Sequence, residues 1–119
     1  MTPQTFSLEM CRHLSSLVPG FEGHWVYAKS QCPRQPDDEQ MRIFCFNESY
    51  CKDEIIPAWQ VEDVLSNLEF IIDRKIYLEN EQKLRGLLPG ITQKISSLLV
   101  RHPDTAYQKI EEYLWIILK

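Results

Sequence analysis

The sequence predicts a small α+β domain in which a helix, an antiparallel β-hairpin and several further helices follow one another. Three observations lead to this prediction. Apolar residues recur at helical spacing near the N-terminus, two short runs of aromatic and β-branched residues follow, and most of the second half returns to helical spacing. With 119 residues, of which 44% are hydrophobic and 25% charged, the chain has the size and composition of one globular domain. We therefore predict a single domain over residues 1–119.

The first helix is predicted over residues 5–18. Its apolar side chains recur at steps of four, four, three and one residues and so fall on one side of a helix: Phe6, Met10, Leu14, Leu17 and Val18. Thr5 or Ser7 can accept a backbone N–H bond at its start, and Pro19-Gly20 ends it.

Residues 24–29 and 41–46 are rich in aromatic and β-branched side chains, which favour strands. The segment between them contains two prolines and three consecutive acids, so we expect an exposed loop joining two antiparallel strands.

Alternation gives each strand of the hairpin one face with two aromatic residues and one cation. These side chains are Trp25, Tyr27 and Lys29 in the first strand, and Arg42, Phe44 and Phe46 in the second. If the register places both sets on one face, the four rings would form a platform of the kind that binds single-stranded nucleic acid. The alternative is that this face is the apolar core.

The second half is predicted to be mainly helical. The hairpin can carry a short third strand. An extended lead-in with Pro57 precedes a helix over residues 60–72. Residues 74–78 allow a short strand, and residues 79–88 allow one or two helical turns ended by Pro89-Gly90. Two amphipathic helices follow, giving three or four helices after the hairpin.

The charge of the chain is −4, from 13 basic and 17 acidic residues, and it is unevenly distributed. Residues 1–60 carry 5 basic and 8 acidic groups, whereas residues 61–119 carry 8 and 9. This balance disfavours nucleic acids and membrane surfaces as partners, because both are polyanionic. The acids in the two predicted turns instead suggest a binding edge for a protein with a basic surface. The candidate partner-binding residues are Asp37, Asp38, Glu39, Asp53 and Glu54.

The cysteines are Cys11, Cys32, Cys45 and Cys51, and no two of them form a C-x-x-C pair. We expect free thiols and no metal or other cofactor, because structural zinc sites usually take two ligands from one tight turn. The alternative is a zinc site at the end of the hairpin, formed by Cys32, Cys45 and Cys51 together with His24.

Motifs of the common enzyme classes are missing from the sequence. The four glycines form neither a phosphate-binding loop nor a dinucleotide fingerprint, and there is no G-x-S-x-G or H-E-x-x-H. We therefore predict that the protein is not an enzyme. Residues 1–20 lack the features of a signal peptide, and the longest apolar run, residues 113–118, is too short to cross a membrane. The expected location is cytoplasmic.

The C-terminal segment is apolar around much of a helix, beyond the side that a core requires. Such a helix is either central to the core or half of an interface. If the protein is an oligomeric structural subunit, the contacts are expected at Trp115, Ile116 and Leu118.

Two segments resemble small uncharacterised proteins of phages and prophages. These proteins carry an I-P-A-x-[ST]-L-x-x-L-L segment and a C-terminal helix that starts near an acid-Thr-Ala step and ends in an apolar run. The matching residues are Ile56, Pro57, Ala58, Val61 and Leu65, and then Thr105, Ala106, Leu114, Trp115 and Ile116. The resemblance implies an origin in a mobile element and supplies no catalytic residue. From the acidic turns and the missing enzyme motifs we predict a non-enzymatic module that inhibits or adapts a larger partner, of the immunity or anti-defence type. The alternative is an oligomeric accessory protein of a phage.

Overall fold

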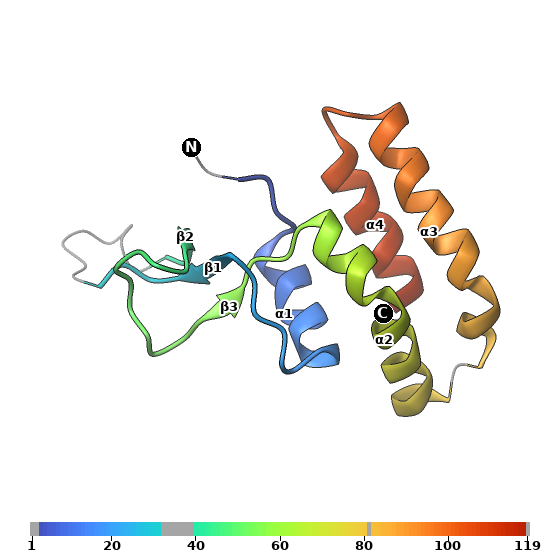
Figure 1. Cartoon of the computed structure of the whole chain (residues 1–119), viewed down its shortest axis with the longest axis horizontal. Helices are drawn as coiled ribbons and strands as arrows, with labels where there is room; N and C mark the ends of the chain where they lie inside the picture. The colour runs from blue at the N-terminus through green and yellow to red at the C-terminus, as the bar shows by residue number, and fades with distance from the viewer. Residues whose placement is uncertain (1–2, 32–39, 81, 119) are drawn as a thin grey trace. The chain divides into compact units, whose positions relative to one another are not determined.

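The structure is a computed structural model that describes residues 3–31, 40–80 and 82–118 (Figure 1). Its elements are α1 (Leu8–Leu17), β1 (Trp25–Ala28), β2 (Arg42–Cys45), β3 (Ile56–Pro57), α2 (Val61–Glu79), α3 (Lys83–Arg101) and α4 (Ala106–Leu118). The predicted α+β class and the order of elements are confirmed, including the short third strand. Contacts within the chain group into two compact units, Met1–Trp59 and Gln60–Lys119, which we describe in turn.

In the first unit, α1 begins where the sequence offers a cap. Ser7 is the N-cap, and its Oγ accepts the backbone N–H of Met10 at 3.2 Å. The inward side of α1 buries apolar residues at the predicted spacing: Met10, Cys11, Leu14 and Leu17. A capping hydroxyl and an apolar stripe therefore define this helix.

The sheet of the first unit has the strand order β2-β1-β3, with β1 antiparallel to both neighbours. Trp25 lies opposite Cys45, and Tyr27 lies between Ile43 on one side and Ile56 on the other. Since Pro57 cannot donate a ladder hydrogen bond, its place at the sheet edge follows the usual rule for proline in strands.

The register separates the two aromatic sets of the hairpin. Phe44 lies opposite Val26, on the other face from Trp25 and Tyr27. The register that would place four rings on one face is therefore not the observed one. Val26 and Ala28 instead pack with Tyr50 in a small apolar cluster, against which Phe44 lies. Burying these residues fixes the register, because a slip of one residue would turn Val26 and Ala28 outward.

Trp59 is the central anchor of the first unit and is fully buried. Phe21 stacks on its ring with centroids 3.9 Å apart. Its indole Nε1–H donates to Ser15 Oγ at 3.0 Å, and its carbonyl oxygen accepts the Phe6 N–H at 3.0 Å. These contacts join the segment after β3 to α1 and to the residues before it.

In the second unit, α2 is longer than predicted. It continues through Glu79, so residues 74–78 are helical and the expected strand there is wrong. The reason is that its inward side continues beyond residue 72 and buries Ile76 as well as Lys75. Asn80 ends the helix in the left-handed conformation, with φ 56°, and its N–H donates to Ile76 O.

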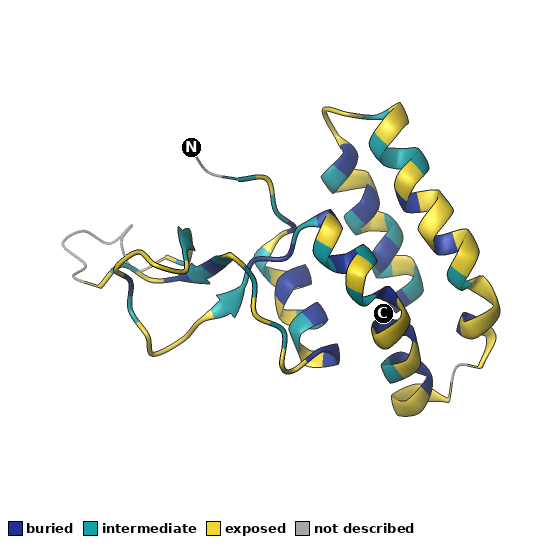
Figure 2. Ribbon diagram, viewed as in Figure 1, coloured by how far each residue is buried: buried dark blue, intermediate teal, exposed yellow. Residues whose placement is uncertain are grey.

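Pro89 does not end a helix, contrary to the sequence prediction. It lies inside α3, which also contains Gly86 and Gly90. A proline there removes one backbone hydrogen bond, but the helix keeps an inward side on which Leu84, Ile91 and Ile95 are buried (Figure 2). Tertiary burial therefore outweighs the local stop signal.

In the second unit, α3 contacts both α2 and α4. In α4 the buried residues are Ala106, Ile110, Leu114 and Leu118. Across the described ranges, no helix combines the length and apolar character that crossing a membrane requires.

Candidate partner-binding site

An apolar pocket of about 470 Å³ opens on the first unit. Its lining comes from four places in the chain: the segment between α1 and β1, strand β1, the turn after β2, and β3 with the residue before it. The lining residues are Phe21, Glu22, Gly23, Val26, Phe46, Tyr50, Ile55 and Pro57. This volume lies within the range of roughly 300–1,000 Å³ that is usual for binding pockets.

In the turn after β2, two hydrogen bonds to its backbone hold Phe46 at the pocket. The Phe46 N–H donates to His24 O at 2.9 Å, and Tyr50 Oη donates to Phe46 O at 3.1 Å. Glu48 closes the turn, since its Oε1 accepts the Cys45 N–H at 2.8 Å. Phe46 nevertheless leaves 54% of its surface exposed. The turn therefore presents a fixed aromatic side chain to solvent.

Buried side chains form the inner part of the pocket. Val26 and Tyr50 are both buried, and the Phe44 ring lies 5.6 Å from that of Tyr50. The Lys52 ammonium lies 3.8 Å from the centre of the Tyr50 ring, an attractive cation–π geometry. Ile55, with 38% of its surface exposed, belongs with Phe46 to the accessible part.

Four acidic residues line this pocket or lie close in sequence to residues that line it. Glu22 lines the pocket directly, Glu48 lies two residues after Phe46, and Asp53 and Glu54 immediately precede Ile55. All four residues are exposed. Glu54 also pairs with Arg12, with 2.9 Å between Oε1 and Nη2, while each side chain remains about half exposed. The site is thus an aromatic and aliphatic pocket accompanied by four exposed carboxylates, which we call its acidic surround, and by one cation, Lys52, on the Tyr50 ring.

The predicted partner-binding residues are only partly covered by the structure. Asp53 and Glu54 do not line the pocket themselves, but they directly precede Ile55, which does. The candidates of the predicted loop, Asp37, Asp38 and Glu39, lie outside the described residues, as does the possible zinc ligand Cys32.

The three described cysteines, Cys11, Cys45 and Cys51, form no disulfide bond with one another. Cys11 is buried, and its Sγ accepts the Trp59 N–H at 3.2 Å. Cys45 Sγ lies 3.3 Å from His24 Nε2, so the structure brings together two of the candidate zinc ligands. Within the described residues no three histidine, cysteine or acidic side chains are grouped as a metal ion would require.

The candidate residues of the oligomer face on α4 differ in how far they are buried. Ile116 is 80% exposed, whereas Leu118 is fully buried within the chain and cannot contribute to an outer face. Trp115 is half-buried, and its Nε1–H donates to Glu111 at 3.4 Å. Placing Leu118 on the outer face is therefore wrong, because it continues the buried stripe four residues after Leu114.

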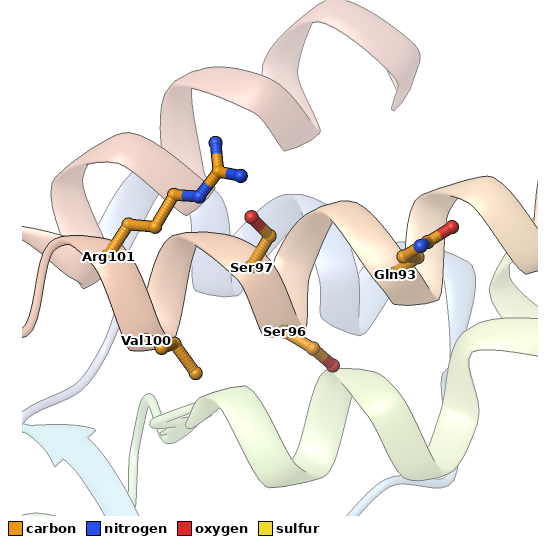
Figure 3. Close-up of a pocket in the computed structure, with 5 residues that line it drawn as sticks. All are labelled: Gln93, Ser96, Ser97, Val100 and Arg101. Atoms are coloured by element: carbon orange, nitrogen blue, oxygen red, sulfur yellow. The ribbon is translucent and has the colours of Figure 1, made fainter.

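A hollow of about 330 Å³ lies along the outside of α3 (Figure 3). All of its lining residues come from this one helix: Gln93, Ser96, Ser97, Val100 and Arg101. Its side chains diverge to the two sides of the helix rather than converging on one point (Figure 3). We therefore assign no binding role to it.

Sequence reasoning proposed Asp53 and Glu54 as candidate partner-binding residues and did not predict the pocket lined by Ile55. Its residues belong to separate segments that only the folded sheet brings together. A usable signal was present: Phe46, Tyr50 and Ile55 are large apolar residues inside stretches that are otherwise polar and turn-forming. Apolar residues in such stretches often mark contact surfaces.

Comparison with models of protein families, with curated proteins and with solved structures finds no match for this chain. The site is therefore interpreted from its own geometry and chemistry.

Proposed function

We propose that this protein is a small, acidic, cytoplasmic, non-enzymatic module that binds a larger protein and inhibits or adapts it. The partner carries a basic surface, and the interaction is of the type made by immunity or anti-defence proteins of mobile elements. The observation that carries the proposal is the pocket of the first unit, in which exposed Phe46 and Ile55 are accompanied by acidic side chains.

Protein interfaces commonly combine an apolar, aromatic centre with a polar rim. Here Phe46 and Ile55 supply the centre and Glu22 lies at the pocket, and we assign the exposed Glu48 and Asp53 to the rim. An apolar side chain of the partner enters the pocket, while lysines and arginines around it face the carboxylates. The negative charge accelerates the encounter and rejects acidic competitors, and occlusion of the partner's surface produces the effect without covalent chemistry.

The proposal is tested by capture from a lysate of the source organism on immobilised protein. Phe46→Ser removes the aromatic contact at an exposed position and is expected to reduce capture of the specific partner at least about tenfold. Val100→Ser is the matched control, because Val100 is an 81% exposed apolar residue of the second unit.

The charge of the rim is tested in the same assay by Asp53→Lys, an exposed position at which the fold is expected to be unaffected. It should weaken capture, and more strongly at low salt than at high salt. Equal capture by wild type and by both the Phe46 and Asp53 variants would contradict the proposal.

A further inference from the structure

A second pocket, of about 340 Å³, lies within the second unit where α2, α3 and α4 approach one another. Its lining combines cationic and aliphatic side chains from the three helices: Lys75, Glu79, Lys83, Leu84, Leu87, Ile116 and Ile117. It shares no residue with the pocket of the first unit and does not enter the proposed function.

The unusual member of this pocket is Lys75, which is only 3% exposed. Lysine is almost never buried to this extent, because removing an ammonium group from water is costly unless an anion accompanies it. Glu79 supplies one carboxylate, with 2.6 Å between Nζ and Oε2, but about half of the Glu79 side chain lies in solvent. An ammonium has three N–H donors, and one carboxylate oxygen does not occupy them all.

Two further features make the pocket favourable for an anion. Lys83 adds a second cation, so the lining carries two positive charges and one negative charge. Lys83 and Leu84 are also the first two residues of α3. The N-cap residue of α3, Gln82, makes no side-chain cap hydrogen bond, and the first turn of the helix contains no acidic residue, so the positive end of the helix dipole favours an anion there.

The rest of the lining is aliphatic. Leu84 is buried and forms an inner wall, whereas Leu87 and Ile116 keep 50% and 80% of their surfaces exposed. A ligand that satisfies both parts of the pocket needs one anionic group and a short apolar chain. We propose that this pocket binds a medium-chain fatty acid, with its carboxylate at Lys75 and Lys83 and its alkyl chain along Leu84, Leu87 and Ile116.

The test is a chemical-shift titration of the ¹⁵N-labelled full chain with octanoate and, separately, with 1-octanol, which has the same chain length without the charge. Octanoate is expected to shift the amide signals of Lys83 and Leu84 saturably and to bind at least about tenfold more tightly than octanol, as a charge-assisted contact requires. Octanol binding as tightly as octanoate would overturn the proposal.

Two substitutions test whether the octanoate carboxylate lies at Lys75 and Lys83. Lys75→Met keeps the length of the buried stem and should reduce octanoate affinity about tenfold while leaving octanol binding unchanged. Lys83→Gln, at an exposed position where folding is not at risk, should reduce octanoate affinity about threefold. Lys94→Gln is the control, because Lys94 is exposed on the same helix but does not line this pocket.

Three further outcomes would overturn the assignment. They are equal octanoate affinity in the Lys83→Gln and Lys94→Gln variants, tighter binding of octylammonium than of octanoate, and concentration-dependent self-association that Ile116→Ser abolishes. The last result would assign the pocket to a second copy of the chain.

Discussion

At Asp63, burial and hydrogen bonding act in opposite directions on one carboxyl group. Asp63 lies in the first turn of α2, and its Oδ2 accepts the Gln60 N–H at 2.9 Å. Burial raises the pKa of Asp63, the bond from Gln60 lowers it, and the neighbouring charge of Glu62 raises it further, so the net shift is upward. The fold therefore favours the protonated form of this group.

This direction predicts how stability changes with pH. A carboxyl whose pKa is raised on folding stabilises the fold below its unfolded value of about 3.9 and loses that contribution as pH rises through the folded value. Asp63→Asn keeps an acceptor for Gln60 but does not titrate. As pH falls from 7 through the raised pKa, wild type should therefore gain stability relative to the variant. The measured quantity is the difference between their free energies of unfolding, wild type minus variant, and it should increase. Urea unfolding at a series of pH values measures this difference, and a flat or decreasing difference on acidification would contradict the assignment.

Tyr107 provides a cap for α2 from a distant part of the sequence. Its Oη accepts the Val61 N–H at 3.1 Å, and Val61 is buried. Tyr107→Phe leaves this N–H without its acceptor and should lower the free energy of unfolding by about 1–3 kcal/mol. Tyr113→Phe is the matched control, because burial raises the pKa of both tyrosines but Tyr113 provides no such cap. Chemical denaturation measures both variants, and equal losses would contradict the capping role.

At the scale of elements, α1 and the hairpin strands could be predicted because their signals are local. Ser7 and the apolar stripe of α1, and the aromatic and β-branched strands, specify their own structure. The ends of α2 and α3 could not be predicted in this way. Residues 74–78 suit a strand and Pro89 suits a helix end when they are considered alone, but burial along the inward sides of α2 and α3 overrides both preferences.

The continuous α3 predicts stabilising substitutions. Gly86 and Gly90 lie in this helix, and a methyl group added at either position would meet open space. Gly86→Ala and Gly90→Ala should each raise the free energy of unfolding by about 0.5–1 kcal/mol, and Pro89→Ala by up to about 3 kcal/mol. Thermal unfolding followed by circular dichroism tests this, with Gln93→Ala as a control of small effect. Destabilisation by Pro89→Ala or Gly90→Ala would show that the helix is interrupted there.

At the scale of the whole molecule, the candidate site shows what a one-dimensional pattern can and cannot reveal. Asp53 and Glu54 could be proposed as candidates because clusters of acids are visible in the sequence. The pocket was not identifiable, because Phe21, Phe46 and Ile55 become neighbours only when β1 pairs with both β2 and β3. The β1–β2 register that creates this pocket also places the two aromatic sets of the hairpin on opposite faces of the sheet. The four-ring platform considered for nucleic acid therefore does not form, and an apolar pocket is present instead.

The acidic surround also predicts how binding depends on salt. If carboxylates face lysines and arginines of the partner, raising the salt concentration from 50 to 500 mM should slow association more than it accelerates dissociation. Surface plasmon resonance with the captured partner measures both rates. The Asp53→Lys variant should show a weaker salt dependence of association than wild type, and an unchanged dependence would remove Asp53 from the interface.

The central claim is that the pocket of the first unit contacts a protein partner, and site-specific photocrosslinking tests it most directly. Benzoylphenylalanine replaces Phe46 in one preparation and Val100 in the control, since both are exposed apolar positions. In a lysate of the source organism, we expect position 46 to give a discrete protein adduct that Asp53→Lys or high salt diminishes, and position 100 to give none. No adduct from position 46, or the same adducts from both positions, would contradict the account.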